Sequence, residues 1–70
     1  ELKLKRAFSF SDRETEIALM LCDGFTNKQI AAALKLSDGT ARNYISSIYE
    51  KTGTDGRASA IAALQEAARK

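Results

Sequence analysis

At 70 residues the chain is long enough for one domain only, close to the size below which disulfides, metals or partner chains are usually needed for folding. A single cysteine and the absence of histidine exclude an internal disulfide and a zinc site of the usual Cys/His kind, and we expect no cofactor. The lack of proline, with 44% apolar and 29% charged residues, favours a compact helical domain, and the net charge of +2 permits nucleic acid binding without requiring it.

The first predicted helix covers residues 12–23. Ser11 and Glu14 have the spacing of a capping box, in which the Ser11 hydroxyl accepts from the backbone N–H of Glu14 and the Glu14 carboxylate accepts from the N–H of Ser11. Apolar residues then recur at helical spacing. Gly24 can adopt the positive φ at which helices commonly end, so the helix is expected to stop there.

A second helix is predicted over 27–34 and a third over 38–52, with too few residues between them for a long loop. Thr26 and Gln29 repeat the capping-box spacing, and Ser37 is a residue type that favours the N-cap position. A short helix, a tight turn and a longer helix make a helix-turn-helix, whose second helix enters the major groove of DNA. The pattern therefore indicates a DNA-binding motif.

A fourth helix is predicted over 57–69, after Gly53 as the C-cap of the preceding helix. This segment is rich in alanine, the best helix former. The predicted fold class is therefore all-α, a four-helix domain that contains a helix-turn-helix. By contrast, residues 1–7 show neither a capping pattern nor a core pattern, so we expect 1–10 to be a linker or N-terminal extension and 11–70 to be the domain.

Polar side chains gather on the outer face of the predicted helix 38–52. Arg42 and Asn43 can make paired hydrogen bonds to guanine and adenine, and Ser46 is small enough to allow close approach to base edges. Thr40 can donate its hydroxyl to a phosphate at the helix start, where backbone N–H groups favour the same anion. An ordinary solvated helix face is the alternative interpretation of Arg42 and Asn43.

These segments together resemble the C-terminal DNA-binding domain of LuxR-type bacterial transcription regulators, a family that includes many two-component response regulators. The resemblance extends from about residue 10 to residue 64 and rests on three strings: SDRETEI at 11–17, GFTNKQIA at 24–31 and LSDGTARNYISSIYEK at 36–51. It implies a four-helix fold in which the third helix is the recognition helix. The fourth helix of this family commonly helps two domains to pair on a two-fold site.

Carried over by position, the resemblance implies two groups of DNA contacts. Three side chains approach bases: Arg42, Asn43 and Ser46. Three side chains contact phosphates: Thr40, Lys28 and Lys51. For the two lysines the alternative is a solvated cation, which at Lys51 is stabilised by the helix dipole in the last turn.

Two features of the predicted helix 57–69 bear on packing and assembly. We expect Arg57 to pair with Glu14 or Glu16 and to hold this helix against the first, in preference to a phosphate contact. Three alanines form a flat surface that would allow close approach of a second copy: Ala58, Ala62 and Ala63. The alternative is that alanine serves helix propensity alone.

The sequence thus predicts sequence-specific binding of double-stranded DNA by the output domain of a bacterial transcription regulator, as a homodimer in the cytoplasm, with RNA polymerase as a further contact. Two alternatives are a domain similar to region four of a sigma factor, which binds RNA polymerase, and a helical protein-interaction module that never meets DNA. We do not expect an enzyme, because there is no histidine and too little chain to enclose a pocket. No apolar run approaches the ~20 residues of a membrane span, so we expect no membrane partner.

Overall fold

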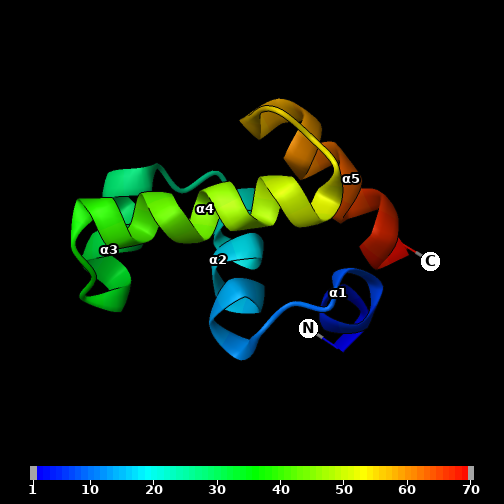
Figure 1. Cartoon of the computed structure of the whole chain (residues 1–70), viewed down its shortest axis with the longest axis horizontal. Coiled ribbons are helices and arrows are strands. Elements are labelled where there is room, and N and C mark those ends of the chain that lie inside the picture. The colour runs from blue at the N-terminus through cyan, green and yellow to red at the C-terminus, as the bar shows by residue number, and fades with distance from the viewer. Residues whose placement is uncertain (1, 70) are drawn as a thin grey trace.

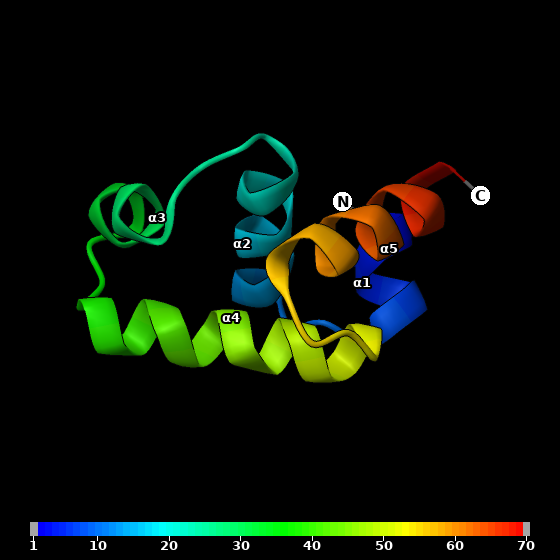
Figure 2. The same cartoon turned by 90° about the horizontal axis from the view of Figure 1, so that it is seen from above.

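The chain forms α-helices and, within residues 2–69 that the computed structural model describes, no strand. The helices are α1 (Leu2–Phe8), α2 (Asp12–Cys22), α3 (Asn27–Leu34), α4 (Asp38–Thr52) and α5 (Arg57–Arg69). α4 runs along one edge of the molecule, with α3 beside its start and α2 packed across its middle (Figures 1 and 2). α1 and α5 lie side by side near its end. None of the described helices is both long and apolar enough to cross a membrane.

The helix starts follow the predicted hydrogen-bond patterns. The hydroxyl of Ser11 accepts from the backbone N of Glu14 at 3.1 Å, and Oε1 of Glu14 accepts from the backbone N of Ser11 at 2.9 Å. Thr26 and Gln29 make the same pair of bonds, at 3.1 and 2.9 Å. The side chain of Ser37 caps α4. These bonds satisfy backbone N–H groups that have no partner within the helix, so both predicted capping boxes are confirmed.

The helix ends agree less completely with the prediction. Gly53 caps the end of α4 with φ of 70°, and Gly24 follows α2 with φ of 87°, as expected of glycine at these positions. α2 itself stops at Cys22, one residue before the predicted end. α3 ends at Leu34, and its C-cap Lys35 has φ of 57° although lysine rarely adopts the left-handed conformation. This left-handed residue makes the turn between α3 and α4 tight enough to form the helix-turn-helix.

Apolar side chains from every helix meet in one core. The largest of the fully buried ones are Leu4, Ile17, Leu21, Ile30, Ile48 and Leu64. Each such side chain contributes ~1.5–3 kcal/mol when it leaves water, so the helices are held together mainly by this cluster. α4 therefore presents one side to the core, and its opposite side is free for another role.

Two residues before α2 contribute side chains to the core. Leu4 is 1% exposed and Phe10 is 3% exposed, and both belong to the core. The ring of Phe8 lies 5.3 Å from that of Phe10 between centroids, which closes the turn into α2. α1 thus packs on α5, and Leu4 and Phe10 belong to the folded domain. The sequence pattern missed this because Leu4 and Phe8 are only one helical turn apart, which is too short an apolar run to indicate a helix.

Candidate nucleic-acid interface

The outward side of α4 carries the predicted base contacts. Figure 2 shows the other helices on one side of α4, which leaves its opposite side uncovered. The residues of α4 that enter the core are Ala41, Ile45 and Ile48. The three predicted base-contacting side chains are all exposed: Arg42, Asn43 and Ser46. The helical repeat thus separates a packing side from a side that can enter a groove.

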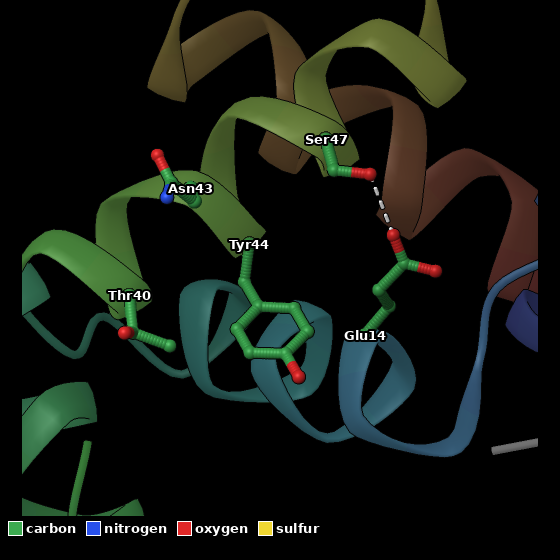
Figure 3. A pocket seen from close by; sticks show the side chains of 5 residues that line it. All are labelled: Glu14, Thr40, Asn43, Tyr44 and Ser47. Atoms are coloured by element: carbon green, nitrogen blue, oxygen red, sulfur yellow. Dashed lines mark hydrogen bonds between the residues drawn. The ribbon is translucent and has the colours of Figure 1, made fainter. Parts of the chain in front are cut away.

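A hollow of about 350 Å³ lies between α4 and the start of α2 (Figure 3). It is lined by Thr40, Asn43, Tyr44 and Ser47 of α4 and by Glu14 of α2. Two predicted contacts, Thr40 for phosphate and Asn43 for base, are brought together here. Ser47 was not among the predicted site residues. Its position four residues after Asn43 places the two on the same side of the helix, one turn apart, and this spacing was the signal in the sequence.

A second hollow, of about 170 Å³, lies where the start of α3 meets the start of α4. Lys28 and Asn27 line it from α3, and Arg42 and Asp38 line it from α4. The structure therefore brings a predicted phosphate contact, Lys28, beside a predicted base contact, Arg42. Two cations beside a helix N-terminus form an environment that favours a phosphate group, although the carboxylate of Asp38 partly offsets their charge.

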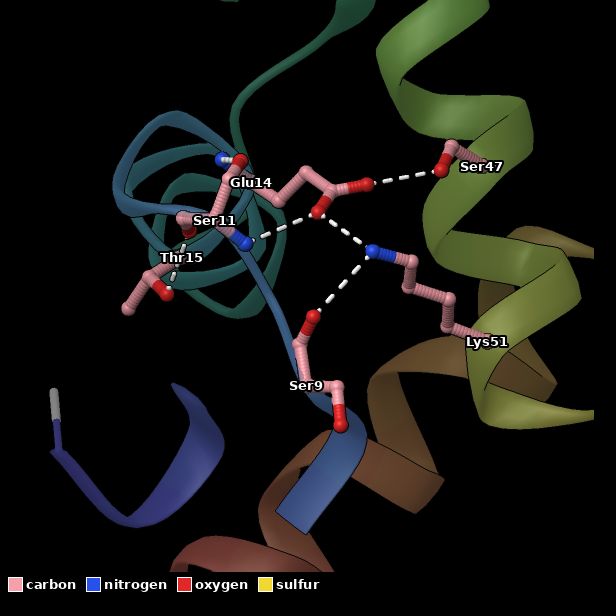
Figure 4. A network of polar contacts seen from close by, with 6 residues as sticks. All are labelled: Ser9, Ser11, Glu14, Thr15, Ser47 and Lys51. Carbon is pink, nitrogen blue, oxygen red and sulfur yellow. Dashed lines mark hydrogen bonds and ion pairs between the residues drawn. The ribbon is translucent and has the colours of Figure 1, made fainter. Parts of the chain in front are cut away.

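A network of hydrogen bonds joins α2 to α4 through Glu14 (Figure 4). Oε1 of Glu14 accepts from the backbone N of Ser11 at 2.9 Å and from Nζ of Lys51 at 2.8 Å. Oε2 accepts from the hydroxyl of Ser47 at 2.7 Å. Nζ of Lys51 also donates to the carbonyl oxygen of Ser9 at 3.2 Å. The carboxylate thus ties the end of α4 to the start of α2 and, through the lysine, to the turn after α1.

This carboxylate remains ionised although it is buried. The side chain of Glu14 is only 7% exposed. Burial raises its pKa, but hydrogen bonds from Lys51, Ser11 and Ser47, together with the charge of Lys51, outweigh the burial and lower the pKa from 4.5 to about 2. Glu14 is therefore a negatively charged hydrogen-bond acceptor throughout the neutral pH range.

The structure places Lys51 in an ion pair. Its side chain is 37% exposed, so it lies at the edge of the network and not free in solvent. The sequence indicated either a phosphate contact or a solvated cation stabilised by the helix dipole, and neither interpretation foresaw the carboxylate partner. An ammonium group has three N–H bonds, and two of them are directed at Glu14 and Ser9. One N–H remains for another acceptor.

Arg57 makes different contacts from those predicted. Its guanidinium donates to the carbonyl oxygen of Phe25 and, at 3.4 Å, to Oδ1 of Asn27. The expected pairing with Glu14 or Glu16 is therefore corrected. Glu14 instead accepts from Ser11, Ser47 and Lys51, and Arg57 reaches the turn between α2 and α3. It holds α5 against that turn, close to the second hollow.

The three alanines predicted for pairing of two copies lie on α5. Ala58 and Ala62 are exposed, and Ala63 is half-buried. The residues of α5 that enter the core are Ala60 and Leu64. Within residues 2–69, no group of cysteine, aspartate and glutamate side chains has the arrangement needed to hold a metal ion.

A family model places the whole helix-turn-helix in a known group of proteins. The model described as GerE, bacterial regulatory proteins, luxR family, matches residues 8–64. This range includes the interval from the capping box of α2 to Leu64 of α5. No solved structure gives a significant match to the chain.

Curated proteins that resemble the chain are bacterial regulators. The transcriptional regulatory protein DesR of Bacillus subtilis (strain 168) is 43% identical over 56 residues, which are 80% of this chain and 28% of that protein. The spore germination protein GerE of the same organism is 40% identical over 52 residues, which are 74% of this chain and 70% of that protein. The transcriptional regulatory protein DegU of Brevibacillus brevis is 35% identical over 49 residues, which are 70% of this chain and 21% of that protein.

The chain spans less than a third of the length of DesR and DegU, so the likeness to them concerns one part of those proteins. The range matched by the family model, residues 8–64, includes the capped helices α3 and α4 and the tight turn between them. The helical fold, the helix-turn-helix and the family match all agree with the resemblance drawn from the sequence. The chain belongs to the luxR family of bacterial regulatory proteins.

Proposed function

We propose that this domain binds double-stranded DNA sequence-specifically, with α4 in the major groove, as the output domain of a bacterial transcriptional regulator. The observation that carries the proposal is the uncovered side of α4, where Arg42, Asn43 and Ser46 are exposed while the opposite side is anchored in the core. The major groove admits one α-helix, and arginine and asparagine are the side chains best suited to paired bonds with guanine and adenine. Membership of a family of regulatory proteins supports the same function.

The proposed phosphate contacts flank this surface. Lys28 lies in the second hollow beside Arg42, at the start of α3. The hydroxyl of Thr40 accepts from the hydroxyl of Ser37 at 2.8 Å, so its own hydrogen can be donated to a phosphate oxygen. Lys51 has one N–H that the network does not use. These three donors would fix the register of the helix on the duplex without reading its sequence.

The proposal includes pairing of two copies on DNA. A single module of this kind buries only about 600–1,000 Å² and releases few counterions, so its affinity alone is modest. The exposed alanines Ala58 and Ala62, with the half-buried Ala63, would allow a second α5 to approach closely. We place the regulator in the cytoplasm, with RNA polymerase as a further contact.

Mobility shift with random-sequence duplex over a range of salt concentrations tests the function directly. We expect binding that weakens steeply as salt rises, because phosphate contacts release counterions. Selection of bound sequences from a random duplex pool should then enrich one half-site, in two copies at a fixed spacing. Absence of any salt-sensitive binding at low ionic strength would overturn the proposal in favour of a protein-interaction module.

Pairing through α5 has its own test on the selected site. Ala62→Glu should abolish cooperative binding of the second copy while leaving the binding of one copy unchanged, because it puts a bulky charge on the contact surface. Ala7→Glu makes the same substitution at an exposed alanine of a different helix, α1, and serves as the control. Equal cooperativity in both variants would exclude this alanine surface from the pairing of two copies.

A further inference from the structure

Ser47 lies beside a proposed base-contacting residue, Asn43, on the surface of α4. It is half-buried, lines the first hollow together with Asn43, and lies one helical turn further along the same side of α4 (Figure 3). If Asn43 reaches a base edge, a neighbouring base edge comes within range of the next turn of the helix. The open hollow in front of Ser47 leaves room for that edge.

The network determines which hydrogen-bonding groups Ser47 can offer. A serine hydroxyl has one hydrogen and two lone pairs. An ionised carboxylate can only accept, so the 2.7 Å contact between Ser47 and Oε2 of Glu14 must use the hydrogen of the serine. Lys51 and the backbone of Ser11 occupy Oε1 of the same carboxylate and hold it in this orientation. Ser47 therefore presents only lone pairs to a partner in the hollow.

An acceptor at this place on a DNA-binding surface is selective. The hydrogen of Ser47 is already donated to Glu14. Phosphate oxygens can only accept hydrogen bonds, so Ser47 cannot bond to the DNA backbone in this arrangement. In the major groove, guanine and thymine offer the acceptors O6, N7 and O4, whereas adenine N6 and cytosine N4 carry amino hydrogens. Only the amino groups of adenine and cytosine complement the lone pairs of Ser47.

We propose that Ser47 is a specificity-determining residue that accepts a hydrogen bond from the amino group of an adenine or a cytosine, with Glu14 as the positioning residue that orients its hydroxyl. The inference rests on the proposed binding of DNA through α4. It adds a fourth base-contacting side chain to Arg42, Asn43 and Ser46 and states which base edges it takes. It also gives the buried carboxylate of α2 a part in sequence recognition without any contact to DNA.

Selection from a random duplex pool tests this proposal with four proteins: the wild type, Asn43→Ala, Ser47→Ala and the control Ser59→Ala. Ser59 is exposed on α5 and lines neither hollow, so its variant should enrich the wild-type site. We expect Ser47→Ala to lose a preference for adenine or cytosine at one position of the half-site, next to the position affected by Asn43→Ala. The loss should be about three- to ten-fold in relative affinity, as for one hydrogen bond.

Glu14→Gln then separates positioning from mere packing. A glutamine amide can donate to Ser47, which frees the serine hydrogen, so the preference at the same position should shift toward guanine or thymine. A role in stability alone would lower the melting temperature without changing the preferred base. Circular dichroism establishes that each variant is folded at the temperature of selection, and Ser47→Ala decides the matter if Glu14→Gln does not fold.

The outcomes distinguish this inference from the proposed function. If the wild type enriches a site and Ser47→Ala enriches the same site with the same preference at every position, the role of Ser47 is overturned while DNA binding stands. If the wild type enriches no sequence, the proposed function fails and the inference fails with it.

Discussion

The exposed amide of Asn43 is the side chain of α4 best suited to pair with adenine, and its removal should affect recognition and not general attraction to DNA. We predict that Asn43→Ala lowers the affinity for the selected site by ~1–3 kcal/mol and leaves the affinity for random duplex nearly unchanged. Titration of both duplexes at one salt concentration measures this difference. Lys28→Ala, by contrast, should weaken both complexes, and equal losses for Asn43→Ala would refute its assignment to base readout.

Lys51 combines an ion pair with a proposed phosphate contact, so its replacement should affect both stability and binding. Lys51→Met leaves the buried carboxylate of Glu14 without its cation, and we expect a loss of about 1–2 kcal/mol in the free energy of unfolding. The loss is below that of a fully buried pair because Lys51 is 37% exposed and water screens it. Urea denaturation measures the change. Lys28→Met is the matched control, and equal stability of the two variants would contradict the structural role.

At the scale of one helix, the cap of α4 controls how the proposed recognition helix begins. The hydroxyl of Ser37 accepts from the backbone N of Thr40 at 3.1 Å. Ser37→Ala removes this acceptor, and we predict a loss of about 0.5–2 kcal/mol in the free energy of unfolding. Ser37→Asp keeps a side-chain oxygen at the cap and should retain most of the stability. A urea midpoint for Ser37→Ala equal to that of the wild type would show that the cap contributes nothing.

Contacts between residues close in the sequence could be predicted from it, whereas contacts between distant residues could not. A capping residue bonds to a residue three positions further on, so the starts of α2, α3 and α4 could be recognised from nearby residues in the sequence. The pairing of Glu14 with Lys51 joins residues 37 positions apart. Nothing in either local sequence identifies the other as its partner, because the contact exists only after α2 has packed across α4. The left-handed turn at Lys35 was missed for a related reason, since burial of neighbouring residues overrides the usual preference for glycine.

The candidate site likewise has features that the sequence could predict and features that depend on how the helices pack. Exposure of Arg42, Asn43 and Ser46 follows from helical periodicity, which the sequence contains in full. The two hollows depend on how α4 lies against α2 and α3, so the place of Ser47 beside Glu14 could not be derived from periodicity. Packing between helices, and not the helices themselves, is the part that required the structure.

For the molecule as a whole, the lowered pKa of Glu14 makes stability depend on acid. In the unfolded chain this carboxyl binds a proton as the pH falls through about 4.5, while in the folded domain it resists protonation until a pH of about 2. Its contribution is therefore fully present above pH 4.5 and is lost as the pH falls from 4.5 toward 2. We expect a loss of at most about 3 kcal/mol, reduced by solvent screening of the partly exposed Lys51.

Urea denaturation at a series of pH values measures this dependence. Glu14→Gln cannot titrate, so its stability should vary less with pH over the same interval, whereas Glu16→Gln, which replaces an exposed carboxylate of the same helix, should follow the wild type. Parallel pH profiles for wild type and Glu14→Gln would exclude this carboxylate as the main acid-sensitive group.

The packing of α1 on α5 has a further consequence for how the chain can be connected. Nζ of Lys3 donates to the carbonyl oxygen of Ala68 at 3.4 Å, and both ends of the described chain lie at the same end of the molecule, away from the start of α4 (Figure 1). A short flexible linker could therefore join the two ends, and new termini could be opened in the exposed turn at Gly53. Such a circular permutant would keep every helix and both hollows, so the order in which the helices follow one another along the chain is separable from the surface that they build.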